Sequence, residues 1–275
     1  MRNAASLGYL LARSSDTIAD VSSAPDEVRR QALAQFRQAV AEDGPAPRWP
    51  LVLLNGVPDF RERHLLETVD ELLSTLRQMP RGEACLVKKV VDTIISGQEL
   101  DLERFSGASA QHPVALRDAA ELEDYCWRVA GCVGSFWTRL GFQTIDGRFS
   151  EADPAALEQQ GIAYGKGLQL VNVLRDLPAD LAHGRCYLPV KNPGDKATLL
   201  ESHAEWVEKA KGYVVQGELY ADALHLRRLR AASRLPALIA GQTLKRLEDI
   251  QWPALAVRVK VPRYRIYALV LKSLR

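Results

Sequence analysis

Residues 164–189, which read YGKGLQLVNVLRDLPADLAHGRCYLP, combine a helical pattern with a helix breaker. Asp176 and Asp180 stand four positions apart, and Pro178 lies between them. A proline inside a helix has no backbone N–H and crowds the carbonyl four residues earlier, here that of Leu174. A local rule broken in this way often marks a functional or strained site. The plain alternative is that a helix ends here and both acids are solvated.

A second pair of aspartates, Asp16 and Asp20, has the same spacing in the stretch YLLARSSDTIADV, residues 9–21. Side chains at positions i and i+4 share one helix face, so each pair presents two carboxylates side by side. Acidic pairs of this kind are common on solvated helices, which is the plain interpretation of each pair taken alone. Two pairs far apart in the sequence could instead face each other across a helical bundle, and their repulsion would then require a cation.

The residues around the aspartates favour a magnesium site. Mg²⁺ prefers oxygen ligands and is usually held by one or two carboxylates together with substrate phosphates. Asn172 lies one turn before Asp176 and could add an oxygen ligand. Arg175, Arg185 and Lys166 could meet phosphate oxygens. The predicted metal ligands are therefore Asp16, Asp20, Asn172, Asp176 and Asp180.

Composition indicates an ordinary globular protein, because 47% of the 275 residues are hydrophobic and 25% are charged. The net charge of +2 gives no sign of a nucleic-acid partner. The four cysteines lack metal spacing and are typical of reduced thiols in a cytosolic protein, so a cytoplasmic location is expected. No run of about 18 apolar residues predicts a transmembrane helix.

The C-terminal stretch VRVKVPRYRIYALVLKSLR, residues 257–275, is basic with apolar residues between the charges. It could rest on an anionic membrane, which would place the protein peripherally at the inner membrane face. The plainer interpretation is a final packed helix with a solvated basic face.

Helical periodicity dominates the chain, and it predicts one all-α domain, residues 1–275, of roughly nine to eleven helices. The only alternating segment of note is VRVKV, residues 257–261, and no stretch is long enough for a flexible linker. Apolar residues recur at helical spacing in residues 63–78, 85–101, 121–142, 162–177 and 235–250.

Four stretches resemble motifs of the squalene/phytoene synthase family, in the same order and at similar spacing. GLQLVNVLRDLPADLAHGRCYLP (167–189) is similar to the second aspartate-rich motif of that family. YLLARSSDTIAD (9–20) resembles the first motif in the form more typical of squalene synthases, and the bacterial squalene synthases are the nearest match. YCWRVAGCVG (125–134) and, more weakly, GQELDL (97–102) agree with two further family stretches.

The resemblance implies an isoprenoid synthase fold, a single helical bundle with a central cavity. It also implies head-to-head condensation by a trans-prenyl transferase of two farnesyl diphosphates, with Mg²⁺, through presqualene diphosphate to squalene. NADPH would be needed if squalene is the product. Two alternatives remain open. The enzyme could make phytoene or dehydrosqualene without NADPH, or the chain could be a non-catalytic relative that acts as an assembly or binding protein.

The same resemblance implies roles for individual residues. The catalytic set would be the four aspartates and Tyr125, which matches a family tyrosine assigned to cation stabilisation or proton handling. Glycines in the cavity stretch would let a chain-shaped substrate approach the helix backbone. A core tyrosine and a helix-packing amide are the plain alternatives for Tyr125 and Gln169. The expected substrate contacts are Tyr9, Arg13, Val129, Gly131, Gln169, Asn172, Arg175, Arg185 and Tyr187.

The sequence departs from the family at its start and in its first motif. About one further helix is expected before Tyr9, so a misassigned start codon, a truncation that weakens activity, or loss of catalysis are competing explanations. Ala19 stands where squalene synthases often have another acid. Pro178 is expected to loosen or bend the end of its helix and to fix residues 184–189 over the diphosphate.

Overall fold

The computed structural model describes residues 1–257 and 259–274. The chain divides into two compact units, Met1–Ser106 and Gly107–Arg275. Each unit is built from helices, and the described residues contain only two short strands, so the predicted all-α class is confirmed. The prediction of one domain stays a prediction.

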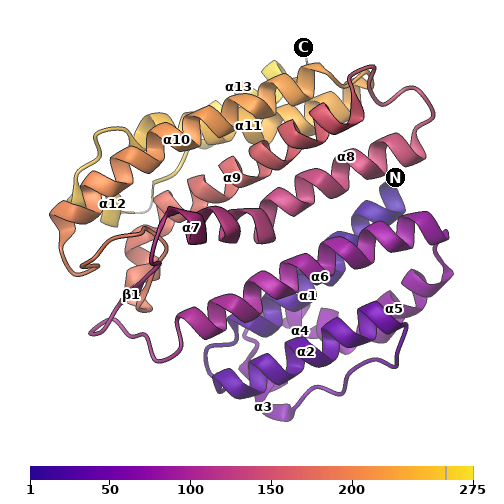
Figure 1. The fold of residues 1–275 in the computed structure, drawn as a ribbon, viewed down its shortest axis with the longest axis horizontal. Helices are drawn as coiled ribbons and strands as arrows, with labels where there is room; N and C mark the ends of the chain where they lie inside the picture. The colour runs from indigo at the N-terminus through magenta and orange to yellow at the C-terminus, as the bar shows by residue number, and fades with distance from the viewer. Residues whose placement is uncertain (258, 275) are drawn as a thin grey trace. The chain divides into compact units, whose positions relative to one another are not determined.

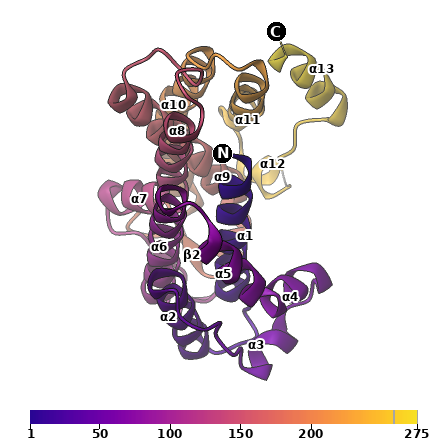
Figure 2. The ribbon, with the colours of Figure 1, turned by 90° about the vertical axis from the view of Figure 1, so that its right-hand side faces the viewer.

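The first unit is a set of helices packed around α1 (Figure 2). Leu7, Leu11 and Ile18 lie on one face of α1 and are buried, which gives this helix the apolar stripe expected of a packed helix. α6, α2, α5 and α4 all contact α1. The helices are α1 (Arg2–Asp20), α2 (Asp26–Glu42), α3 (Leu51–Gly56), α4 (Phe60–Glu67), α5 (Val69–Gln78) and α6 (Arg81–Arg104).

The second unit is organised by α9, which packs against α8, α10 and α11 (Figure 1). The 29 residues of α9 make it the longest helix in the described residues. The helices of this unit are α7 (Ala119–Cys126), the π-helix η1 (Trp127–Gly131), α8 (Cys132–Thr144), α9 (Pro154–Ala182), α10 (Lys196–Asp222), α11 (Arg227–Leu247), α12 (Trp252–Ala256) and α13 (Arg263–Ser273).

Most of the periodic segments form helices, but two of the five are interrupted. Residues 63–78 divide at Thr68, whose hydroxyl donates to the carbonyl of His64 and so ends α4 locally. Residues 121–142 contain the π-helix between α7 and α8. These breaks and short helices such as α3 and α12 raise the number of α-helices in the described residues to thirteen.

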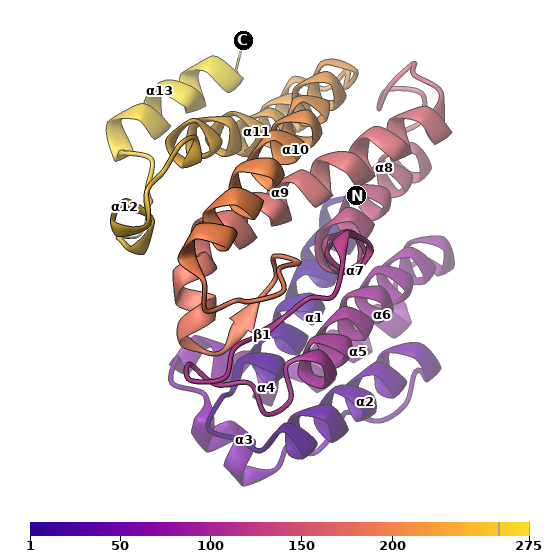
Figure 3. The same cartoon turned by 60° about the vertical axis from the view of Figure 1, so that its left-hand side comes forward.

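The alternating segment 257–261 contains no strand in its described residues, and Arg258 lies outside them. Two other segments form a strand pair instead, β1 (Val114–Ala115) and β2 (Arg185–Cys186), and they run parallel (Figure 3). Val114 pairs with Arg185, and Ala115 pairs with Cys186. The segment that follows α9, predicted as a loop, is therefore tied to the segment that precedes α7. Within the described residues, no helix combines the length and hydropathy needed to cross a lipid bilayer.

Glycines set the distance between α8 and α9. A Cβ on Gly134 would lie 1.9 Å from the carbonyl oxygen of Gly161, and a Cβ on Gly165 would lie 2.4 Å from the carbonyl oxygen of Ala130. Real Cβ atoms do not approach backbone this closely, so glycine is required at both positions. Close helix packing therefore requires glycine at position 134, and Gly134 also lies in the wall of an apolar pocket.

Replacing Gly134 with alanine is expected to lower the free energy of unfolding by about 3 kcal/mol, because α8 and α9 must move apart to admit the methyl group. The matched control is Gly212→Ala, since Gly212 is an exposed glycine inside α10 whose Cβ would meet nothing within 4 Å. That change should stabilise the protein by up to about 1 kcal/mol. Urea unfolding followed by circular dichroism measures both, and equal effects of the two changes would contradict the packing argument.

Candidate active site

The first aspartate pair lies at the C-terminal end of α1 in the first unit. Asp16 is half-buried, and the Gln98 amide of α6 donates to its Oδ1 at 2.6 Å. Burial, followed by the nearby charge of Asp20, raises the pKa of Asp16 from 3.8 to about 6. The two carboxylates therefore oppose each other's ionisation. A cation bound by both carboxylates would offset their repulsion and favour the ionised form of each.

The other two predicted residues on α1 have different surroundings. Arg13, expected to hold diphosphate, forms an ion pair with Glu62 of α4. Tyr9, expected to contact substrate, is 67% exposed. Asp20 is exposed and is the last residue of α1, while Arg29 of α2 donates to the carbonyl of Ala19 at 2.6 Å. That bond satisfies one of the carbonyls left open at the helix end.

In the second unit, four predicted residues form a continuous chain of contacts. The rings of Tyr125 and Tyr187 stack with centroids 4.4 Å apart. The Gln169 amide donates to the Tyr125 hydroxyl at 3.1 Å, and the Asn172 amide donates to the Gln169 carbonyl oxygen at 3.4 Å. The structure thus brings together residues from α7, α9 and the segment after β2. Their functional roles stay predictions.

The second aspartate pair continues this line along α9. Asn172, Asp176 and Asp180 follow at four-residue intervals and share one face of the helix. Arg175 donates to both carboxylate oxygens of Asp176. A cation at Asp176 would therefore share this carboxylate with a guanidinium that already neutralises it.

The expected loosening of the helix end at Pro178 does not occur, and a bend there stays a prediction. α9 continues through Pro178 to Ala182, and β2 begins three residues later. The backbone donor that proline lacks is replaced by a side chain: Nε2 of His203 in α10 lies 3.1 Å from the carbonyl oxygen of Leu174. α9 therefore continues as a helix past a position where a regular backbone bond cannot form.

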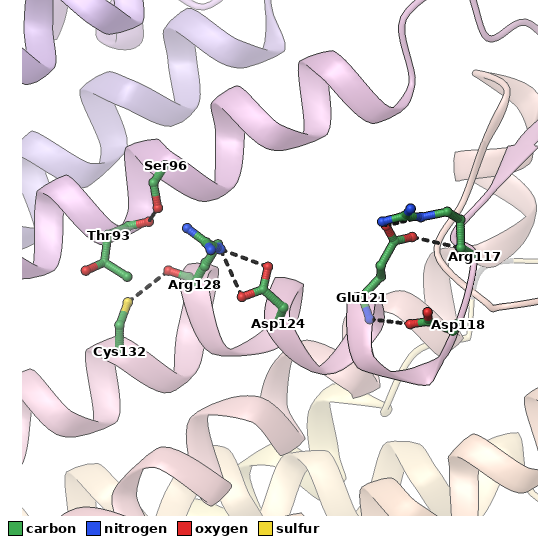
Figure 4. A network of polar contacts seen from close by, with 8 residues as sticks. All are labelled: Thr93, Ser96, Arg117, Asp118, Glu121, Asp124, Arg128 and Cys132. Carbon is green, nitrogen blue, oxygen red and sulfur yellow. Dashed lines mark hydrogen bonds and ion pairs between the residues drawn. The ribbon is translucent and has the colours of Figure 1, made fainter.

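Two local features shape the segment that carries Tyr125 and Val129, and Figure 4 shows the polar contacts of Arg117, Asp118 and Glu121 in the first of them. At the start of α7, the Arg117 backbone N–H and Nε donate to the buried Glu121 carboxylate at 2.7 and 2.6 Å, and Asp118 caps the helix by accepting from the Glu121 N–H. Just after Tyr125, the helix widens into the π-turn of η1, which carries Val129. Such π-turns occur often at functional sites.

An apolar pocket of about 350 Å³ lies inside the second unit and includes Val129 in its wall. Two tyrosines present their rings to it while their hydroxyls bond elsewhere: Tyr164 donates to the Ser233 carbonyl at 2.7 Å, and Tyr220 pairs with the Thr138 hydroxyl at 2.9 Å. The wall is therefore apolar despite its hydroxyl groups. The lining residues are Val129, Ala130, Val133, Gly134, Trp137, Gly161, Tyr164, Gly165, Leu168, Tyr220, Ala232, Ser233 and Pro236.

Some predicted residues lie outside this arrangement. Lys166, expected to meet phosphate, forms an ion pair with Glu123, which also accepts from Lys209 at 2.6 Å and from the Tyr213 hydroxyl at 2.8 Å. Gly131 is absent from the pocket wall, and a Cβ there would meet Lys166 at 3.0 Å. Arg185 is half-buried in β2.

Sequence reasoning missed two residues that contact the predicted site. Gln98 lies inside the stretch GQELDL, so the weak motif marks its position without indicating its bond to Asp16. His203 has no metal-ligand spacing to the other histidines, so a search for metal motifs does not find it. The sequence holds one indication that such a residue exists. Pro178 leaves the carbonyl of Leu174 without its regular backbone donor, so a side chain elsewhere is needed to donate to it.

The donor chemistry of the aspartate pairs fits Mg²⁺ in part. Each pair offers two carboxylates, and Asn172 adds an amide to the second pair. The described residues contain no group of three or more histidines, cysteines or acids that could hold a metal ion. Mg²⁺ commonly binds through one or two carboxylates and completes its shell with water and substrate phosphates. The pairs are thus suited to an ion that arrives with a diphosphate.

The chain belongs to the squalene/phytoene synthase family, because the model of that family matches residues 1–265. It is 31% identical to the presqualene diphosphate synthase of Zymomonas mobilis over 69% of the chain and 51% of that protein. It is 23% identical to the squalene synthase of Saccharomyces cerevisiae over 99% of the chain and 61% of that protein. The chain therefore spans about half to three fifths of the length of these relatives.

A solved structure shows the same fold. The complex of TcSQS with the ligand E5700 matches all of this chain and 79% of its own, with a TM-score of 0.79 and 21% sequence identity. At this identity the likeness concerns the fold, and it confirms the expected all-α isoprenoid synthase class.

Replacing Asp16 with asparagine is expected to stabilise the metal-free protein at pH 7 by about 1 to 3 kcal/mol. Because folding raises the pKa of this carboxyl from 3.8 to about 6, its ionisation opposes folding, and wild-type stability falls as the pH rises between these values. The gain should therefore disappear near pH 4. Urea unfolding in EDTA across this range measures it, and a variant less stable than wild type at pH 7 would contradict the argument.

Proposed function

We propose that this chain catalyses the Mg²⁺-dependent head-to-head condensation of two farnesyl diphosphates, through presqualene diphosphate to squalene. The observation that carries the proposal is the line of polar side chains in the second unit. It runs from Tyr187 and Tyr125 through Gln169 to the acidic face of α9. Helices of the same unit line a partly open apolar pocket. One group of helices thus offers groups for a diphosphate head and a wall for a prenyl tail.

The chemistry requires both features. Departure of a diphosphate leaves an allylic cation, which water would destroy, so the reacting carbons need a dry cavity. Val129 and the rings of Tyr164 and Tyr220 provide apolar surface for this purpose. Tyr125 is buried, and its hydroxyl accepts from Gln169, so its position is held while its ring is stacked on Tyr187.

The proposed ligands of Mg²⁺ are Asp16 and Asp20 in the first unit, and Asn172, Asp176 and Asp180 in the second. When bound, the ion would neutralise charge that develops on the leaving diphosphate. Arg175 is already oriented by Asp176 and would donate to a diphosphate beside the ion. Arg185 and Tyr187 follow α9 directly and complete the proposed set on this side. Arg13 would have to exchange Glu62 for phosphate, which makes it the weakest of the proposed contacts.

The product distinguishes neighbouring activities of the family. Relatives are named presqualene diphosphate synthase, squalene synthase and phytoene synthase. NADPH is a reductant that only the squalene outcome requires. The relative with 31% identity is named presqualene diphosphate synthase. This similarity supports the proposal that this chain carries out at least the first step, the condensation to presqualene diphosphate.

The test is incubation of the protein with farnesyl diphosphate and Mg²⁺, with and without NADPH, and mass spectrometry of the extracted products. Squalene that depends on NADPH is the expected result. Presqualene diphosphate or dehydrosqualene in both conditions would move the activity to a neighbouring member. No product from farnesyl or geranylgeranyl diphosphate would overturn catalysis and favour a binding or assembly role.

Asp16→Asn and Asp176→Asn are each expected to lower turnover by at least about a hundredfold, since each removes a charge that the proposed ion requires. Asp70→Asn is the matched control, because this carboxylate is largely exposed on α5. It should leave turnover within about twofold of wild type. Unchanged turnover in both of the first two variants would overturn the proposed metal ligands.

The outer face of α13 supports a peripheral membrane contact. Tyr264, Tyr267, Leu271 and Leu274 are spaced by three or four positions and are 54 to 68% exposed, so they form one apolar stripe. α13 contains basic residues and no acidic residue, and it packs on α11. Exposed aromatic and aliphatic side chains beside basic ones suit the surface of an anionic bilayer. We therefore propose such a bilayer as the partner of this face.

Changing Tyr267 and Leu271 together to glutamate is expected to weaken binding to phosphatidylglycerol-containing vesicles by at least about tenfold. The matched control changes Val215 and Leu219 to glutamate, because these are exposed apolar residues at the same spacing on α10. Vesicle flotation measures binding. Equal loss in both double variants, or a concentration-dependent dimer that only the α13 variant disrupts, would contradict the proposed membrane contact.

A further inference from the structure

His203 of α10 lies against the one position in α9 where the backbone hydrogen-bond ladder is interrupted by sequence. Pro178 has no N–H, so the regular bond to the carbonyl of Leu174 cannot form. Nε2 of His203 lies 3.1 Å from that oxygen. The imidazole is 2% exposed, so water cannot replace it readily as the donor.

The direction of this bond defines the form of the histidine. A carbonyl oxygen only accepts, so Nε2 must carry the proton. Burial lowers the pKa of His203, which favours the neutral ring. His203 is therefore a neutral imidazole that donates from Nε2, and this tautomer is set by the helix it contacts.

The bond lies on the opposite side of α9 from the acidic face but at the same height along the helix. Leu174 sits between Asn172 and Asp176, and Pro178 sits between Asp176 and Asp180. An unsatisfied buried carbonyl at Leu174 would cost free energy, and the helix could escape that cost by unwinding near Pro178. Unwinding there would change the spacing of the two carboxylates.

We propose that His203 is a positioning residue, which holds the Asp176–Asp180 face of α9 in helical register by replacing the backbone donor that Pro178 removes. This inference rests on the proposed function, in which these aspartates bind a divalent cation. His203 contacts neither the ion nor the substrate in this role. It acts through the geometry of the helix that carries the ligands.

The test compares three changes of the full chain. His203→Leu removes the donor, His203→Gln retains an amide N–H donor, and Pro178→Ala restores the backbone N–H. Binding of Mn²⁺ is measured by the electron paramagnetic resonance signal of the free ion. Amide hydrogen exchange is measured for residues 179–182. His225→Leu is the matched control, because His225 is an exposed histidine in the same unit.

His203→Leu is expected to weaken Mn²⁺ binding about 10- to 100-fold, the range found for groups that orient metal ligands, and to speed exchange at residues 179–182. His203→Gln should recover most of the affinity. Pro178→Ala in the His203→Leu background should recover it too, because the backbone N–H again reaches Leu174. A merely structural histidine would not be rescued at the metal site by a change in another helix.

Each remaining result overturns the inference. Equal Mn²⁺ affinity of wild type and His203→Leu would overturn it, as would a Pro178→Ala, His203→Leu double variant that binds no better than His203→Leu. If His203→Leu does not fold, the double variant and His203→Gln still carry the comparison. A wild-type chain that binds no Mn²⁺, either alone or together with inorganic pyrophosphate, would overturn the proposed metal ligands first and this inference with them. Product formation in the farnesyl diphosphate assay separates these cases.

Discussion

The close approach of α8 and α9 is the constraint on which the second unit depends. Backbone meets backbone where Gly134 faces Gly161 and where Gly165 faces Ala130. No side chain separates the two helices at these points, so their distance has little freedom. The pocket wall and the Gln169 amide both take their positions from this contact. Side chains carried by helices in direct backbone contact are held in fixed positions relative to one another.

Helical periodicity was sufficient to predict the fold class and the middle of α9, residues 162–177, because a long amphipathic pattern survives local exceptions. The aspartate pairs and Tyr125 were found through motifs that are contiguous in sequence. Partners distant in sequence were not predictable in this way. The bond from Gln98 to Asp16 and the pairing of Lys166 with Glu123 depend on how helices pack, and no local pattern encodes that.

The error at Pro178 has a physical cause. Propensity correctly marks proline as costly inside a helix, but the cost arises from a lost donor, and a donor can come from another element. His203 supplies it across the contact between α9 and α10. Tertiary structure thus overrides a strong local signal where a buried polar side chain is available. The π-turn of η1 and the break at Thr68 are further departures that apolar periodicity alone does not reveal.

The short pairing of β1 with β2 has a consequence for the order of folding. It joins positions roughly seventy residues apart, so its formation carries a loop-closure entropy cost that the local hydrogen bonds of a helix do not carry. The face of α9 that carries Asp176 and Asp180 is local and can form as soon as that helix does. The stacking of Tyr125 on Tyr187 must wait for the loop to close. The chain therefore acquires its acidic face early, and the aromatic end of the site is among the last parts to assemble.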